Sequence, residues 1–117
     1  MKKILCLALA MMLALSCIFT LVSCDNKSDD KVIKIGVFEP ASGSNGPGGK
    51  QETLGVIYAN SVQNTIELNG ETYRIELVEV DNQSDNAKGV TAASELVSKG
   101  VSVVLGSYGS GVSIAAS

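Results

Sequence analysis

The last part of the chain holds a loop whose serine hydroxyls and backbone amides suit a small anion. Val101 to Leu105 is a β-branched run, Gly106 to Gly111 is rich in glycine and serine, and an alanine-rich stretch follows. This order predicts a strand, a tight loop and the first turns of a helix. Hydroxyls and free N–H groups at a helix start can hold a carboxylate. The loop is therefore the first candidate for a ligand site.

Nucleotide chemistry is poorly supported by the first glycine-rich loop. Gly49-Lys50 follows a strand pattern and several glycines, which invites a P-loop interpretation. Ser44 and Gln51, however, stand where that motif requires a glycine and a Ser or Thr. A hydroxyl for magnesium is therefore missing, and we predict no nucleotide cofactor.

Catalytic chemistry is no better supported. The chain has no histidine, so it offers neither a Ser-His nor a Cys-His pair. Glu39, Asp81 and Asp85 could form a carboxylate cluster, yet each also fits a simpler role at a strand end or a helix cap. We predict that the protein is not an enzyme and that it holds no cofactor or metal.

The elements that must position these loops follow one another as strand and helix patterns. Val32 to Phe38 is almost continuously apolar, as in a strand buried on both faces, and Glu39-Pro40 ends it. From Lys50 the apolar period becomes helical, and Asn69-Gly70 is the predicted helix stop. The predicted buried face of this helix consists of Leu54, Ile57, Tyr58, Ser61, Val62, Thr65 and Ile66.

A second strand-helix pair follows. Tyr73 to Val80 alternates like a half-buried strand and is predicted at a sheet edge. Asp85 is a suitable N-cap for the next helix, which Lys99-Gly100 ends. The order predicts an α/β fold, a Rossmann-like parallel sheet with flanking helices. Right-handed crossovers would bring the loops 41–49, 81–84 and 106–111 to one rim.

The N-terminus has the pattern of an export signal. Lys2-Lys3 precedes an apolar run from Ile4 to Val22, and small residues and a polar stretch follow it. This pattern predicts a signal peptide over residues 1–23. The alternative is a transmembrane anchor, since nineteen residues could just span a bilayer.

Leu21-Val22-Ser23-Cys24 resembles the bacterial lipobox. The resemblance implies cleavage after Ser23 and a lipid on Cys24, with residues 24–31 as a lipidated tether to the membrane. An ordinary secretory signal with an incidental Cys24 is the alternative. The other two cysteines lie within the leader, so the mature chain could form no disulfide framework.

The charge balance also limits the kinds of partner that the protein could bind. The leader carries two of the nine Lys and Arg residues and none of the twelve acidic ones, which leaves a net charge of −5. The chain has neither a basic patch nor a basic stripe, so we predict no nucleic-acid partner.

Several short segments together resemble one protein family. They are Ile33-Lys-Ile-Gly-Val37, Tyr73-Arg-Ile-Glu-Leu-Val78, Asp81-Asn-Gln-Ser-Asp85 and Val103-Val-Leu-Gly106. In this order they resemble the N-terminal part of the branched-chain amino acid (leucine/isoleucine/valine-type) substrate-binding proteins of ABC transporters. The resemblance implies the type I periplasmic-binding fold, in which two lobes close on a ligand around a hinge. Residues 32–117 would be a partial N-terminal lobe.

The resemblance also implies a function and site residues. It implies an extracytoplasmic, lipid-anchored protein at the bacterial cell membrane that delivers an amino-acid-like ligand to an ABC permease. Ser110 matches the family's carboxylate-binding serine, with Tyr108 and Gly109 as flanking wall and backbone. Gly48 stands where some relatives place an aromatic ring, which could admit a larger ligand. Alternatively, Ser110 only caps the helix that it precedes.

Two further expectations concern the whole chain. The same fold serves as the ligand-sensing ectodomain of receptors, which is the alternative function. The chain lacks the usual stop signals of its last helix, and we interpret it as a fragment. An apolar edge at Val101, Val103 and Leu105 predicts that a polypeptide of residues 25–117 alone aggregates or remains molten.

Overall fold

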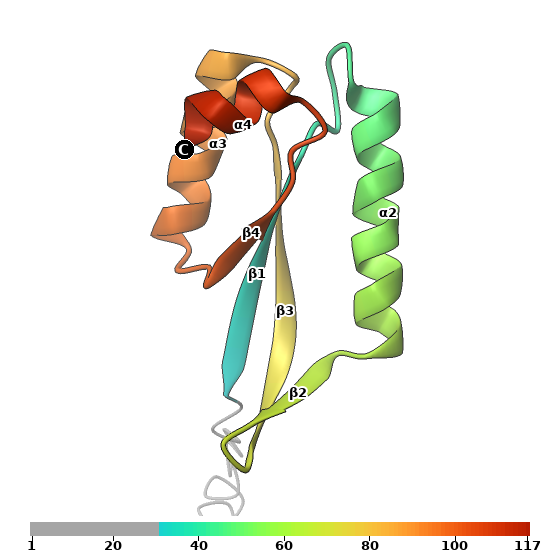
Figure 1. The fold of residues 1–117 in the computed structure, drawn as a ribbon, viewed down its shortest axis with the longest axis vertical. Coiled ribbons are helices and arrows are strands. Elements are labelled where there is room, and N and C mark those ends of the chain that lie inside the picture. Colours follow the sequence, from blue (N-terminus) through green and yellow to red (C-terminus); the bar gives the residue numbers. More distant parts are fainter. Residues whose placement is uncertain (1–30) are drawn as a thin grey trace, which may run out of the picture.

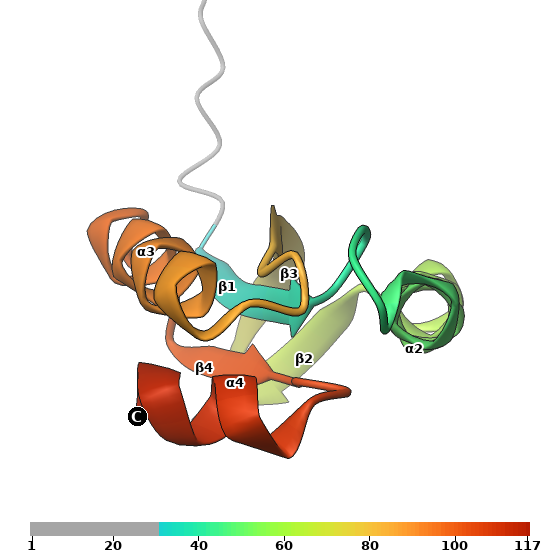
Figure 2. The same ribbon diagram turned by 90° about the horizontal axis from the view of Figure 1, so that it is seen from above.

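In the part of the chain that the structure describes, four strands form one sheet with helices on both of its faces (Figure 1). The computed structural model describes residues 31–117, so the predicted leader and Cys24 lie outside the described residues. In chain order the elements are β1 (Val32–Glu39), α2 (Gly46–Val62), β2 (Thr65–Leu68), β3 (Glu71–Asp81), α3 (Asn86–Ser98), β4 (Val103–Leu105) and α4 (Ser110–Ala116). The strands lie in the order β2-β3-β1-β4. Viewed from above, α2 lies on one side of the sheet and α3 and α4 lie on the other (Figure 2).

The central strand is β1, as its continuous apolar run predicted. It pairs in parallel with β3 along its whole length, from Val32 opposite Arg74 to Glu39 opposite Asp81. On its other side Ile35 to Val37 pair in parallel with β4. The parallel α/β prediction is therefore confirmed.

The core of the described residues lies between the sheet and the two helices α3 and α4. It is built from Phe38, Ala92, Leu96 and Val112, with Val78 and Val80 packed against it. Leu96 is fully buried, and a Cβ on Gly36 would lie 3.0 Å from its Cδ1. The glycine in β1 thus lets α3 approach the sheet closely. Asp85 caps α3 as predicted, because its Oδ1 accepts a hydrogen bond of 2.9 Å from the Lys88 N–H.

The prediction for Asn69-Gly70 was wrong, because these residues form a hairpin turn rather than the end of a helix. Asn69 has φ 54° and Gly70 has φ 79°, the pair of positive values that two-residue hairpins prefer. The short strand β2 therefore turns back and pairs antiparallel with the start of β3. Helix α2 accordingly begins at Gly46, four residues before Lys50, and ends at Val62, well before the predicted stop at Asn69-Gly70.

The predicted buried face of α2 was also wrong. Leu54, Tyr58 and Val62 are 64%, 71% and 69% exposed. The less exposed positions of the helix instead include Gly49, Thr53 and Val56. The helix meets the sheet through small residues near its start, since a Cβ on Gly49 would collide with Pro40.

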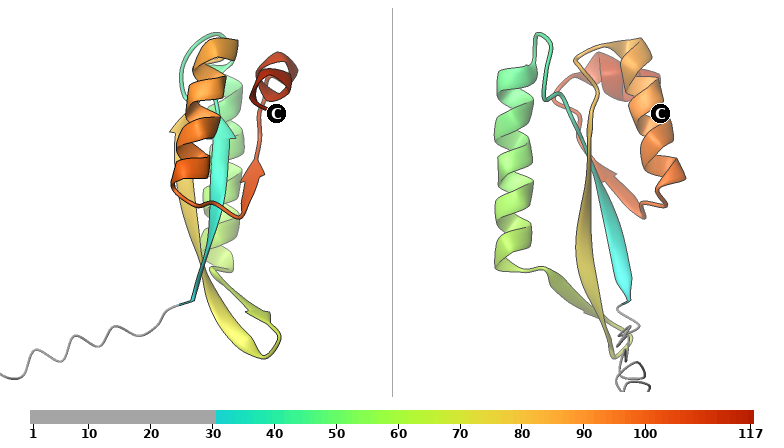
Figure 3. Two further views of the ribbon diagram at one scale, coloured as in Figure 1. Left: turned by 90° about the vertical axis from the view of Figure 1, so that its left-hand side faces the viewer. Right: turned by 180° about the vertical axis from the view of Figure 1, so that it is seen from behind.

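The sheet edges predicted at Tyr73 to Val80 and at Val101 to Leu105 are partly confirmed. In β3, Glu71 to Arg74 pair with β2, whereas Ile75 to Asp81 pair with β1 alone among the described strands. Within residues 31–117, strand β4 pairs with β1 only, and Val103, Val104 and Leu105 are all exposed. The two further views show how short β4 is beside β1 and β3 (Figure 3).

Candidate functional site

Three loops meet at the carboxyl ends of the parallel strands, as the crossover rule predicted (Figure 1). They follow β1, β3 and β4, and they are joined by hydrogen bonds from residues far apart in sequence. Asp81 makes the first connection. Its carboxylate accepts the N–H groups of Ala41 (2.8 Å) and Ser42 (3.3 Å) and the Ser42 hydroxyl (2.7 Å). It also accepts the Gln83 N–H at 2.8 Å, so one side chain organises two loops.

These contacts set the charge state of Asp81. Partial burial acts to raise the pKa of its carboxyl, but the hydrogen bonds from Ser42, Gln83 and Ala41 outweigh burial and lower the pKa. Asp81 is therefore anionic at neutral pH. Ser84 adds a second connection, because its hydroxyl donates to the Ser42 carbonyl and accepts the Asn45 N–H, both at 3.0 Å.

Asn82 is a structural residue of the site that the sequence analysis placed only in a loop. It is fully buried, and its amide nitrogen donates to the Phe38 carbonyl (3.1 Å) and to the Ser107 hydroxyl (2.9 Å). Ser107 Oγ in turn accepts the Gly109 N–H at 3.2 Å. Asn82 thus ties the third loop to the ends of β1 and β3. Its only sequence signal is its position directly after a strand.

Glu39 is the second buried polar residue beneath the third loop. It is 5% exposed, and its Oε2 accepts the Tyr108 N–H at 2.8 Å. Burial raises the pKa of its carboxyl; the Tyr108 N–H opposes this shift, and the neighbouring Glu52 adds to it. Asp85 is engaged as a helix cap, so the three carboxylates form no common catalytic cluster.

The predicted ligand residues lie together on this loop. Gly109 is the N-cap of α4 and Ser110 is the first residue of the helix, with an exposed side chain. Because Gly109 holds the cap position, Ser110 does not act as the cap, and its hydroxyl is available on the rim. A Cβ on Gly109 would lie 3.3 Å from Asn45 Nδ2, which places the first loop beside the third.

Tyr108 and Gly48 are in direct contact. A Cβ on Gly48 would lie 2.6 Å from Tyr108 Cζ, so the tyrosine ring covers the glycine. The side chain of Tyr108 is half-exposed. The space beside Gly48 is therefore not an open extension of the site, because an aromatic ring from the third loop fills it.

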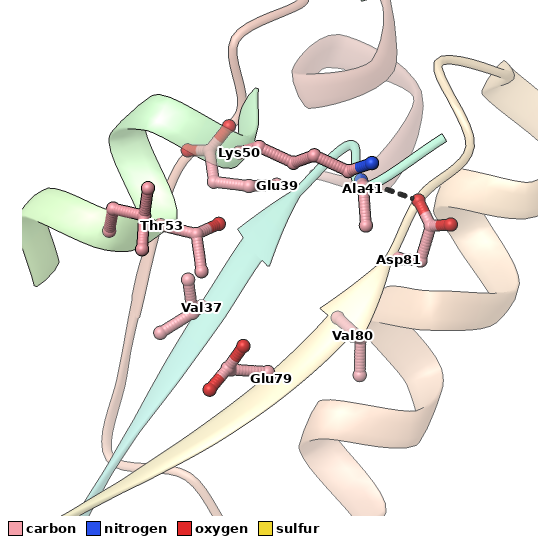
Figure 4. Close-up of a pocket in the computed structure, with 9 residues that line it drawn as sticks. Val37, Glu39, Ala41, Lys50, Thr53, Glu79, Val80 and Asp81 are labelled. Carbon is pink, nitrogen blue, oxygen red and sulfur yellow. Dashed lines mark hydrogen bonds between the residues drawn. The ribbon is translucent and has the colours of Figure 1, made fainter. Parts of the chain in front are cut away.

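A cavity of about 460 Å³ lies below the rim, between α2 and the sheet. Figure 4 shows its lining, with Lys50 and Thr53 from α2 and the strand residues Val37, Glu39, Glu79 and Asp81. Three carboxylates and one lysine thus line the same space. Residues 31–117 contain no group of three His, Cys, Asp or Glu side chains that could hold a metal ion. No helix in this described part of the chain is long and apolar enough to cross a membrane.

A parallel α/β unit with hydroxyl-rich loops at the carboxyl ends of its strands is a Rossmann-like lobe that places a ligand at its rim. The family model described as periplasmic binding protein matches residues 32–117. The chain belongs to this family.

Known proteins agree with this assignment. The Leu/Ile/Val-binding protein homolog 2 of Brucella abortus (strain 2308) is 39% identical over 83 residues, which cover 70% of this chain and 22% of the relative. The solved structure of the branched-chain amino acid transporter substrate-binding protein LivJ from Streptococcus pneumoniae, in complex with isoleucine, has a TM-score of 0.63 and 33% identity. The match covers 74% of this chain and 25% of the LivJ chain.

A third relative binds a different kind of molecule. A solute-binding protein of an ABC transporter from Rhodopseudomonas palustris, in complex with benzoate, has a TM-score of 0.60 and 31% identity. The match covers 73% of this chain and 23% of that one. The chain thus spans about a quarter of the length of these relatives. They are binding proteins, which confirms the predicted family, its fold and its non-enzymatic character.

Proposed function

We propose that this chain belongs to a lipid-anchored solute-binding component of an ABC transporter, and that its rim holds the carboxylate of an amino-acid-like ligand. The observation that carries the proposal is the loop of Tyr108, Gly109 and Ser110, which presents an exposed hydroxyl at the carboxyl end of β4. Buried side chains hold this loop from below.

The relatives support a carboxylate as the shared recognition element. Isoleucine and benzoate, the ligands of two similar solved structures, differ in shape and in the presence of an amino group, but both carry a carboxylate. Ser110, with Gly109 beside it, would bind this common group. Tyr108 would form the wall against the rest of the ligand, since its ring is half-exposed at the same place. Gly48 would contribute indirectly, because its missing side chain leaves room for the Tyr108 ring.

Isothermal titration of the full natural chain without residues 1–23 tests the ligand class. We expect L-leucine, L-isoleucine, L-valine or benzoate to bind, and the matching amide, such as leucinamide or benzamide, to bind at least tenfold more weakly. Ser110→Ala should reduce the affinity for the bound carboxylate by about ten- to a hundredfold, because a hydrogen bond to a charged group contributes about 1.5–3 kcal/mol.

The matched control is Ser94→Ala on α3, where the hydroxyl bonds only to its own helix at Val90. This variant should bind like the unmutated chain. An amide that binds as tightly as its acid, or a Ser110→Ala variant with full affinity, would rule out the proposed carboxylate site.

Membrane anchoring through Cys24 is the second part of the proposal, and the lipobox pattern supports it. In a bacterial host fed with labelled palmitate, the full natural chain should incorporate label and sediment with the membrane. Cys24→Ser should abolish the label, because the thioether requires the cysteine sulfur. Label that persists in Cys24→Ser would contradict lipid attachment at Cys24, whereas an unlabelled natural chain that sediments with the membrane would favour an uncleaved transmembrane anchor.

A further inference from the structure

Glu39 is a buried acid that has no ion pair within the described part of the chain. It ends β1 opposite Asp81 and is 5% exposed. A neutral amide could make the same hydrogen bond at a lower desolvation cost, since a buried charge is expensive unless it is paired. The contacts of its carboxylate therefore indicate its role.

The carboxylate of Glu39 contacts the third loop at two places, Tyr108 and Gly106. Its Oε2 accepts the Tyr108 N–H at 2.8 Å. Its Oε1 lies against Gly106, where a Cβ would collide with this oxygen and with the Phe38 carbonyl. Gly106 has φ 116°, a conformation that favours glycine, so the loop backbone is able to pass directly over the acid.

Asn82 supports the same loop from the neighbouring strand. Through the Ser107 hydroxyl it connects to the Gly109 N–H. Together the two buried side chains hold three successive residues, Ser107, Tyr108 and Gly109, directly before Ser110. Asn82 is neutral, so Glu39 is the ionisable member of this support.

The charged neighbours of Glu39 come from two elements. Helix α2 contributes Glu52, in contact with Glu39, and Lys50; β3 contributes Glu79 and Asp81. Carboxylates thus predominate around the acid. An anion bound at Ser110 would add another negative charge nearby, and electrostatics would then favour the protonated form of Glu39.

We infer that Glu39 is a positioning residue for carboxylate binding: through the Tyr108 N–H it fixes the backbone that presents Gly109 and Ser110. This inference rests on the proposed function. A protonated Glu39 can still accept the Tyr108 N–H through its carbonyl oxygen, so protonation keeps the support and removes the repulsion. Affinity for an anionic ligand therefore increases as Glu39 takes up a proton.

The experiment compares Glu39→Ala and Glu39→Gln in the full natural chain, with L-isoleucine and benzoate as probes. Glu39→Ala should weaken binding by at least tenfold. Glu39→Gln should remain within about threefold of the unmutated chain at pH 7, because an amide oxygen also accepts the Tyr108 N–H. Glu79→Ala is the matched control, since it removes an exposed carboxylate from the same cavity and should leave the affinity unchanged within twofold.

A pH profile separates positioning from a general effect on folding. As the pH falls from neutral toward the ordinary pKa range of a glutamic acid, the unmutated chain should bind more tightly, whereas Glu39→Gln should show a flat profile. Full affinity in Glu39→Ala, or a parallel pH profile in Glu39→Gln, would overturn the inference.

Hydrogen exchange tests the support without any ligand. In Glu39→Ala the Tyr108 amide should exchange at least tenfold faster, while the Lys88 amide, capped by Asp85, should be unchanged. An unchanged Tyr108 amide would overturn the inference even if a ligand binds. A chain with the expected exchange pattern that binds no carboxylate would contradict only the proposed function.

Discussion

At the scale of single residues, the two acids at the strand ends have opposite environments. Asp81 receives four hydrogen bonds from the surrounding loops, and these lower the pKa of its carboxyl despite partial burial. Glu39 receives one backbone hydrogen bond and lies beside Glu52, so burial keeps the pKa of its carboxyl raised. Adjacent positions in the β1–β3 register thus respond to pH in opposite directions.

This difference predicts a stability maximum in weakly acidic solution. A raised pKa in the folded state means that folding favours the protonated Glu39, so its contribution to stability increases as the pH falls through that pKa toward about 4.3. A lowered pKa means that Asp81 stabilises the fold above its unfolded pKa of about 3.9 and loses this effect as the pH falls further. Urea unfolding of the full natural chain from pH 7.5 to 3 should show both limbs.

Two substitutions test which acid causes each part of this pH profile. Glu39→Gln should remove the increase between neutral and weakly acidic pH. Asp81→Asn should lower the free energy of unfolding at pH 7 by about 1–2 kcal/mol, a value discounted for its partial exposure, and should flatten the acid limb. A monotonic profile that neither substitution alters would contradict the assignment of these two acids.

At the scale of elements, the hairpin between β2 and β3 shows how a local signal was misjudged. An Asn-Gly pair suits both a helix end and a two-residue hairpin turn. Thr65 and Ile66 continue the helical spacing of the preceding residues, so the pattern favoured a longer helix. In the structure these residues form a strand, because they pair with β3 from Thr65 opposite Arg74 to Leu68 opposite Glu71.

Two glycine substitutions test this assignment. Gly70→Ala should lower the free energy of unfolding by about 1 kcal/mol, because an L side chain is strained at φ 79°. Gly55→Ala is the matched control within α2, where a Cβ would have nothing within 4 Å. This change should instead stabilise the protein by about 0.5–1 kcal/mol through helix propensity. Equal effects in urea unfolding would argue that Asn69-Gly70 does not form the turn.

At the scale of the whole molecule, burial is distributed unequally over the two faces of the sheet. Phe38, Ala92, Leu96 and Val112 form a core with α3 and α4. On the opposite face α2 leaves cavities of about 460 and 600 Å³ against the sheet. Leu54, Tyr58 and Val62 of this helix are largely exposed, as are the three residues of β4.

A polypeptide of residues 25–117 alone should therefore aggregate or remain molten. So few buried apolar side chains cannot offset the conformational entropy of folding, and β4 offers an apolar edge for pairing with another chain. Size-exclusion chromatography, dye binding and calorimetry measure this directly. A monomer with a sharp, cooperative melting transition would contradict the prediction and would indicate that these residues form a stable unit by themselves.

The sequence by itself determined the order of strands and helices except for β2, the parallel pairing of the other strands, the N-cap at Asp85 and the meeting of three loops at one rim. These features follow from local periodicity and from the handedness of crossovers, which short segments encode. The same local patterns carried the family resemblance, which the match over residues 32–117 confirms.

Only the tertiary structure decided which residues support the rim. Tyr108 and Glu39 are 69 positions apart, and Asn82 and Phe38 are 44 apart, so no local pattern links them. It also decided which face of α2 turns toward the sheet, where Gly49 lies directly against Pro40. Apolar spacing predicts that a helix has an apolar face, but packing against another element determines which face is buried.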